Sequence, residues 1–304
     1  MQKSDQTALP RSVVNQAWLI VLGAIAPMLD STMVNIAINH LAHDFNTGLN
    51  TVQWVVTGYL LAMVVAVPFT GWLDQRFGGK NTFLVAELLF GLMSLGAAFA
   101  WNIDSLIAFR LVQGFSAGLI TPLLTTLLVD VAGSGAMGRL MAVVGLPIML
   151  GPIVGPVIGG VIVQYLTWRW IFLVNVPVTI IAAWLLWTKL PATPAKNPQA
   201  KFDWIGVLLL AGMSASVIYG VVQASQKANF TNHTTLTDVA IGLVLLVGYL
   251  VYAAFKRTNV LIPLTLFKRL NFSASMVGLF LAGVATNGPM LLLPLFFQNL
   301  RGES

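Results

Sequence analysis

The stretch Gly145–Gly160 reads G-L-P-I-M-L-G-P-I-V-G-P-V-I-G-G and lies in an apolar segment long enough to cross a bilayer. Gly151, Gly155 and Gly159 share one helical face, where a neighbouring backbone can approach closely. Prolines flank that face at Pro147, Pro152 and Pro156. Each proline bends the helix and frees a carbonyl that protein or a water-filled cavity must cover. The stretch predicts an interior helix beside a moving or ligand-bearing cavity, although membrane helices are generally richer in glycine and proline.

The composition is that of a membrane protein. Charged residues make up 9% of the chain and hydrophobic residues 57%, with a mean hydropathy of +0.84, whereas about a quarter of an ordinary soluble domain is charged. The absence of cysteine excludes disulfides, thiolate metal sites and cysteine nucleophiles. The histidines His40, His43 and His233 fall in predicted loops, so we expect no metal site and no cofactor. The sequence predicts an all-α polytopic protein in contact with the lipid bilayer.

Nine apolar runs approach the length of about 20 residues that a spanning helix needs. They cover residues 15–38, 53–73, 82–101, 103–128, 139–163, 170–189, 205–224, 237–255 and 273–297. The segment 191–204 opens with three prolines in eight residues, Pro191, Pro194 and Pro198, and predicts a linker. It separates a block of six spans (15–190) from the remainder, and residues 1–14 form a polar N-terminus.

The basic residues predict the orientation. With a cytoplasmic N-terminus, the outer segments hold only Arg169, Lys227 and Arg301. The inner segments hold Lys3, Arg11, Arg76, Lys80, Arg139, Lys189, Lys196, Lys201, Lys256, Arg257, Lys268 and Arg269. This excess of positive charge predicts a multi-pass protein of the plasma (cytoplasmic) membrane with its N-terminus inside. Because the basic residues are distributed by membrane side and form no continuous patch, we expect no nucleic-acid partner.

Three ionisable residues lie well inside predicted spans: Asp30, Glu87 and Arg110. Each would cost roughly 3 kcal/mol or more facing lipid, so each should face the bundle interior. Asp30 and Arg110 both lie roughly 10–12 Å below the outer surface, which makes them candidate partners. The pair can bind a proton or a cationic substrate, or it can be a permanent ion pair. Glu87 is shallower, and both a functional role and snorkelling to water remain open.

Other polar and aromatic residues accompany these charges. Gln113 shares one stripe of the fourth span with Arg110, Gly114 and Gly118, and this stripe suits either tight helix packing or a cavity wall. Trp54, Tyr59, Trp101 and Trp168 are more typical of interfacial anchors than of substrate-stacking groups. The chain has no P-loop and no G-x-S-x-G or H-E-x-x-H motif, so neither ATP-driven transport by this chain alone nor an enzyme is favoured.

Together these motifs resemble the major facilitator superfamily, in particular its 14-spanning drug:proton antiporters of the QacA/EmrB type. Leu29–Ile38, L-D-S-T-M-V-N-I-A-I, is similar to the family's first-span signature, which includes Asp30. Arg110–Gly118, R-L-V-Q-G-F-S-A-G, is similar to the fourth-span motif, whose arginine the family associates with proton coupling. Gly145–Gly160 is similar to the antiporter motif of the fifth span, and Trp168–Pro177, W-R-W-I-F-L-V-N-V-P, is typical of this branch.

The loop after the second span is similar to the superfamily's cytoplasmic loop motif. Its sequence is G-W-L-D-Q-R-F-G-G-K, and the residues that align with the motif are Gly71, Arg76, Gly78 and Lys80. Gln75 stands where the family carries an aspartate, and Asp74 comes one position early. An offset of one residue turns a side chain by about 100° around a helix. The family's gating contact at this loop is therefore in question.

The resemblance implies the major facilitator fold and proton-coupled antiport of amphipathic, cationic drugs. Substrate and protons would be its partners. A complete member would have fourteen spans, so this chain would hold the N-terminal six-helix half, an inserted helix pair (205–256) and the start of the second half (257–304). Such a chain should not transport alone, and it is either part of a longer product or a truncated, inactive one. A metabolite symporter or uniporter, or a non-transporting scaffold or sensor, remain alternatives.

Overall fold

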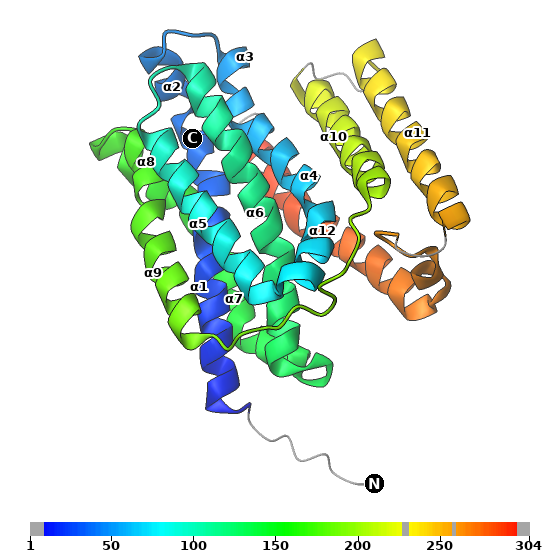
Figure 1. Cartoon of the computed structure of the whole chain (residues 1–304). Coiled ribbons are helices and arrows are strands. Elements are labelled where there is room, and N and C mark those ends of the chain that lie inside the picture. The colour runs from blue at the N-terminus through cyan, green and yellow to red at the C-terminus, as the bar shows by residue number, and fades with distance from the viewer. Residues whose placement is uncertain (1–8, 227–230, 257–259, 297–304) are drawn as a thin grey trace. The chain divides into compact units, whose positions relative to one another are not determined.

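A computed structural model describes residues 9–226, 231–256 and 260–296, and within this part every regular element is a helix (Figure 1). Lys3, Lys227, Arg257 and Arg301, which contributed to the predicted orientation, lie outside the described residues. The chain divides into two compact units, Met1–Gly248 and Tyr249–Ser304. The predicted all-α class is confirmed.

Eight segments of the described chain are long and apolar enough to cross a membrane, and they correspond to the first eight predicted spans. The first comprises α1 (Arg11–Met33), a 3-10 turn (Val34–Ala37) and α2 (Ile38–Asp44). The others are α3 with α4 (Leu49–Val52, Trp54–Phe77), α5 (Gly79–Ala98), α6 (Ile103–Ala132), α7 (Met137–Tyr165), α8 with α9 (Arg169–Leu173, Asn175–Lys189), α10 (Trp204–Gln226) and α11 (His233–Lys256). Short 3-10 turns occupy Ser134–Ala136 and Leu264–Lys268.

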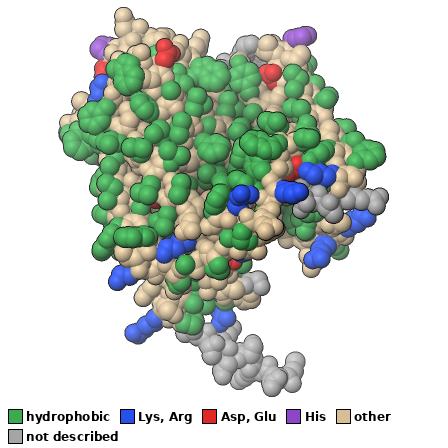
Figure 2. All heavy atoms as spheres, viewed as in Figure 1, with side chains coloured by type: hydrophobic (Ala, Val, Ile, Leu, Met, Phe, Trp, Pro, Cys, Tyr) green, Lys and Arg blue, Asp and Glu red, His purple; other side chains and the backbone are tan. Residues whose placement is uncertain are grey.

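The ninth predicted span forms α12 (Leu270–Phe296) in the second unit. Its part Leu270–Ala285 is a shorter apolar helix. In Figure 2, hydrophobic side chains cover much of the visible surface and charged side chains are sparse. This distribution is the one expected of helices that expose apolar side chains to lipid.

Helices α4 and α6 approach each other at two glycines of α6. A Cβ atom at Gly114 would collide with the backbone oxygen of Tyr59, and one at Gly118 with the backbone oxygen of Met63. Helix α6 also packs along α5. The stripe was expected to serve either helix packing or a cavity wall. Gly114 and Gly118 serve helix packing.

The glycine face of α7 packs against α1. A Cβ at Gly151 would lie 3.1 Å from Met28 Cβ, one at Gly159 would lie 3.1 Å from Met33 O, and one at Gly155 would collide with Thr32 Oγ1. The predicted close approach is thus confirmed at these three positions. Gly145 and Gly160 lie outside it, since an added Cβ there would have no neighbour closer than 4.0 Å.

The rest of α7 differs from the expectation. The helix is continuous over Met137–Tyr165 in spite of its prolines; Pro156 is half-buried, and the side chains of Pro147 and Pro152 lie outside the described part. Its second face is open, with Leu146, Ile153 and Val157 58–67% exposed. Within the described part of the first unit, neighbouring helices cover only the glycine face, so an interior position of α7 stays a prediction for the full-length protein.

Candidate functional site

A buried ion pair lies between α1 and α6. Nη1 of Arg110 donates to Oδ2 of Asp30, and the two residues are only 1% and 0% exposed. The pairing expected from their similar depth is confirmed. Neither charge reaches water in this conformation, so each depends on the other for compensation.

Three amide and hydroxyl side chains extend this pair into a network. Gln113 Oε1 accepts from Arg110 Nη1 at 2.7 Å, and Gln113 Nε2 donates to Ser94 Oγ at 3.0 Å. Asn175 Nδ2 donates to Asp30 Oδ1 at 2.9 Å and lies 3.1 Å from Ser94 Oγ. The Ser94 hydroxyl donates to Phe172 O at 3.1 Å. The network joins α1, α5, α6 and α9 through residues that are at most 2% exposed.

Arg110 has further partners that fix its orientation. Its Nε donates to Val55 O at 3.1 Å, so the guanidinium is bonded to backbone as well as to carboxylate. Its Cζ lies 3.9 Å from the centre of the Tyr59 ring, which is a cation–π distance. The prediction of Tyr59 as an interfacial anchor is wrong: the residue is 1% exposed and packs beneath Arg110.

Apolar side chains enclose the network at both ends. One cluster includes Ile20 and Ala24 of α1, and a second begins one turn beyond Asp30 with Met33 and Val34. Such surroundings exclude water and strengthen every charge interaction inside them. Removing one partner of a buried ion pair typically costs about 3–5 kcal/mol. A change of charge at Asp30 therefore bears directly on how these helices pack.

The sequence singled out part of this network. It named Asp30, Arg110 and Gln113, and the structure brings these three together. It did not assign a role to Ser94 or Asn175. Both are uncharged hydrogen-bonding residues within apolar runs. Burying such a residue in a membrane span costs far less free energy than burying a charge, so the sequence alone does not mark them as site residues.

Glu87 is not part of this network. It is 0% exposed on α5, and neither carboxyl oxygen has a hydrogen-bond partner among the described atoms. The alternative in which Glu87 snorkels to water is therefore wrong.

A second polar cluster forms where the loop motif meets the segment 190–203. Asp74 is buried while Gln75 is exposed, so the aspartate that comes one position early is the one that faces inward. Lys196 Nζ lies 3.3 Å from Asp74 Oδ2 and 3.2 Å from Asp130 Oδ2 at the end of α6. Gln75 takes part only through its backbone oxygen, which accepts from Asn197 N at 2.9 Å.

The other motif residues bind the same segment. Trp72 Nε1 and Arg76 Nη1 both donate to Ala200 O, at 3.0 and 3.2 Å. Lys80 donates from its backbone N to Thr193 Oγ1 at 2.7 Å and from Nζ to Leu190 O, and Nζ also donates to Trp187 O at the end of α9 at 2.9 Å.

Two glycines of the motif behave differently from each other. Gly78 has φ +83°, a conformation that favours glycine, and a Cβ there would collide with Thr193 O. Gly71 has open space around it. The close contact between the loop and the segment 190–203 is thus made at Gly78.

The two carboxylates beside Lys196 stabilise its positive charge. Partial burial lowers its pKa, but hydrogen bonds to Asp130 and Asp74 and the charges of both carboxylates raise it more, so the pKa of Lys196 lies above its usual value. A group whose pKa is higher in the folded state stabilises the fold fully at pH values below its unfolded-state pKa. This stabilisation is lost as the pH rises through the folded-state pKa. The Lys196 contact should therefore persist at neutral pH and weaken only in strongly alkaline solution.

Lys196→Gln should loosen the segment 190–203. Half of the Lys196 side chain is exposed, and ion pairs of this kind contribute about 0.2–1 kcal/mol. Hydrogen exchange at the Asn197 amide should then accelerate by up to about fivefold. Lys201→Gln is the matched control, because Lys201 makes none of the ion pairs found in the described chain. Equal exchange in the two variants would contradict a clamping role for Lys196.

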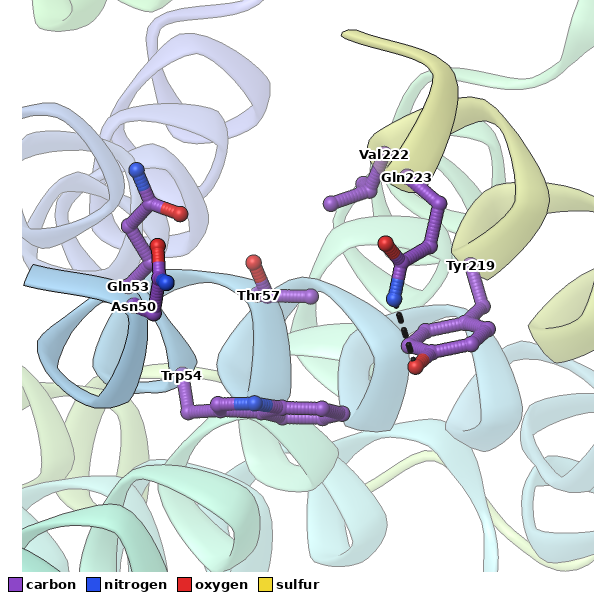
Figure 3. A pocket seen from close by; sticks show the side chains of 7 residues that line it. All are labelled: Asn50, Gln53, Trp54, Thr57, Tyr219, Val222 and Gln223. Atoms are coloured by element: carbon purple, nitrogen blue, oxygen red, sulfur yellow. Dashed lines mark hydrogen bonds between the residues drawn. The ribbon is translucent and has the colours of Figure 1, made fainter. Parts of the chain in front are cut away.

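A cavity of about 390 Å³ lies apart from both clusters, between the start of α4 and α10 (Figure 3). Trp54 forms its floor and stacks on Tyr219 with 5.9 Å between ring centres. Gln223 Nε2 donates to Tyr219 Oη at 2.7 Å, while Asn50 and Gln53 lie on the opposite side. The described residues that line it are uncharged, and none of them is a predicted site residue.

Comparison with known proteins identifies the family. The sequence model of the Major Facilitator Superfamily matches residues 20–304. The chain belongs to the Major Facilitator Superfamily. The resemblance seen in the motifs is confirmed.

Several curated members of the superfamily are similar along almost the whole chain. The "Multidrug resistance protein B homolog" of Mycobacterium tuberculosis is 34% identical over 304 residues, which are 100% of this chain and 56% of that protein. The "Putative multidrug resistance protein MdtD" of Escherichia coli is 32% identical over 292 residues, 96% of this chain and 61% of that protein. The chain thus spans little more than half the length of these relatives.

Solved structures of the superfamily share the fold. The proton:xylose symporter XylE superposes with a TM-score of 0.63 at 17% identity, covering 97% of this chain and 64% of that one. The human organic anion transporter MFSD10 gives a TM-score of 0.52 at 17% identity, with coverages of 69% and 55%. At this identity the likeness concerns the fold alone.

Proposed function

We propose that the full-length protein is a proton-coupled antiporter that exports amphipathic, cationic compounds. In this proposal it lies in the cytoplasmic membrane with its N-terminus inside. The observation that carries the proposal is the buried pair of Asp30 and Arg110. The names of the M. tuberculosis and E. coli relatives, which refer to multidrug resistance, support the substrate class.

The pair supplies a means of coupling. A proton that binds the Asp30 carboxylate removes the charge that holds Nη1 of Arg110. Arg110 keeps Val55 O and Gln113 Oε1 as partners, so it is freed from Asp30 without losing every hydrogen bond. A cationic substrate can neutralise Asp30 in place of the proton, and the two would then compete for one carboxylate. Such competition leads to exchange of substrate for proton across the membrane.

The second cluster has a bracing role in the same proposal. Lys196 bridges the ends of α4 and α6 from the segment that follows α9. With the N-terminus inside, this cluster lies on the cytoplasmic side, where the basic residues are concentrated. These contacts lie within one half of the transporter, so in this proposal they hold that half together while it rocks against the other.

The test is transport by the purified full-length protein in proteoliposomes with ethidium as the probe. An imposed pH gradient should drive ethidium against the flow of protons, and a protonophore should abolish the movement. Ethidium movement that ignores the pH gradient would contradict proton coupling. Movement of ethidium in the same direction as protons would contradict antiport and favour a symporter.

A further inference from the structure

Glu87 is a buried carboxyl group that the coupling pair does not use. Its exposed fraction is 0%, and both carboxyl oxygens lack a hydrogen-bond partner among the described atoms. By contrast, the Asp30 carboxylate has Arg110 and Asn175 as partners.

In the part of the chain that the structure describes, no neighbouring charge is paired with Glu87. Helices α4, α6, α8 and α9 pack on α5, and Gly23 of α1 lies against Phe83 of α5. The other titratable groups of α5 itself and of these neighbouring helices are Arg11, Asp30, Tyr59, Asp74, Arg76, Lys80, Asp104, Arg110, Asp130, Arg169 and Lys189. Among the described residues, none of them forms a hydrogen bond or ion pair with Glu87.

An unpaired carboxylate in such a place is strongly unfavourable. Glu87 is therefore a neutral carboxylic acid in this conformation. Loss of its proton requires water, or another acceptor, to reach the carboxyl group, and that requires the helices around α5 to move. The transport cycle includes changes of conformation that can move these helices.

Glu87 shares a helix face with the network around Asp30. Seven residues, about two turns or 10 Å, separate it from Ser94 on α5. Ser94 Oγ contacts Gln113 and Asn175, and both of these reach Asp30. A rearrangement of that network therefore acts on the helix that carries Glu87.

We propose that Glu87 is a second proton-binding site of the transport cycle, and this rests on the proposed function. In the present conformation the Glu87 O–H bond is intact. When the protein opens to the cytoplasm, the O–H bond breaks, the electron pair stays on the carboxylate and the proton passes to cytoplasmic water. When the protein next opens to the outside, the carboxylate takes up a new proton from the water on that side. Each cycle then moves one proton with Asp30 and one with Glu87.

The number of protons exchanged for each ethidium can be measured, because it sets the net charge that crosses the membrane. Ethidium carries one positive charge, so exchange for one proton moves no net charge and exchange for two protons moves one charge. Only the second process responds to a membrane potential. Glutamine resembles a neutral carboxylic acid in size, so Glu87→Gln retains the buried shape and removes only the exchangeable proton.

The experiment uses the full-length protein in proteoliposomes with a potassium diffusion potential and no pH gradient. Wild-type protein should move ethidium under the potential alone. Glu87→Gln should lose this response at least tenfold while it keeps movement driven by a pH gradient. Asp104→Asn is the control: it removes an exposed carboxylate from the first turn of α6 and should behave as wild type.

The outcomes separate the two proposals. If Glu87→Gln still responds to the potential as wild type does, Glu87 is a structural acid and the inference is overturned. If wild-type protein responds to a pH gradient but not to the potential, one proton is exchanged, so the inference falls without any variant and the proposed function stands. If wild-type protein moves ethidium under neither condition, the proposed function itself fails.

Discussion

Asp30→Asn should abolish proton-driven ethidium efflux by the full-length protein, reducing it to the level of cells without the transporter even after efflux is divided by the amount of protein in the membrane. Asparagine is close to aspartic acid in size but carries neither the negative charge nor the exchangeable proton. It mimics the protonated form of Asp30, a state that the proposed cycle visits, so the variant should still fold, with lower stability because Arg110 is buried without its counter-ion. Arg110 keeps Val55 O and Gln113 Oε1 as partners. The measurement is efflux from preloaded cells, with abundance determined from isolated membranes.

Two comparisons sharpen this test. Asp44→Asn removes a carboxylate from the end of α2 that accepts a hydrogen bond from Trp168 at 2.8 Å, outside the network, and efflux should continue. Asp30→Glu keeps the acid and lengthens the side chain, so partial efflux is expected. Full efflux by Asp30→Asn would refute the coupling role and leave the pair with Arg110 as a structural ion pair.

Gly118→Ala should greatly reduce the amount of folded protein in the membrane. The added Cβ would collide with the backbone oxygen of Met63. Over-packing of a core usually costs about 1–3 kcal/mol, and the cost here should lie at or above the upper end. The obstacle is main chain, which cannot rotate away as a side chain can, so α4 and α6 would have to move apart.

Thermal stability in detergent and membrane abundance measure this effect. Gly138→Ala is the control, because an added Cβ at Gly138 in α7 would have nothing within 4 Å. Its stability should equal that of wild type. Normal stability of Gly118→Ala would show that α4 and α6 do not approach as closely as the structure indicates.

The order and extent of the spans could be predicted from sequence. A helix in lipid must satisfy its backbone hydrogen bonds internally and cover the bilayer with apolar side chains, so the length of an apolar run is nearly sufficient evidence. The isolated charges Asp30 and Arg110 were found for the same reason, since an ionisable residue in an apolar run must face the interior. The regular spacing of Gly151, Gly155 and Gly159 likewise predicted the face that α1 covers.

Other features depend on how helices rotate and pack, which no single segment encodes. Asn175 becomes a partner of Asp30 across 145 positions of sequence, and Lys196 reaches Asp74 across 122. Whether Glu87 is buried and whether Tyr59 lies beneath Arg110 depend on the rotation of α5 and α4. The sequence by itself therefore determined the membrane class, the spans and the two charges that form the pair. Only the tertiary structure decided which uncharged groups complete the site, that Asp74 faces inward in place of Gln75, and that Glu87 has no hydrogen-bond partner among the described atoms, because these are properties of contacts between helices.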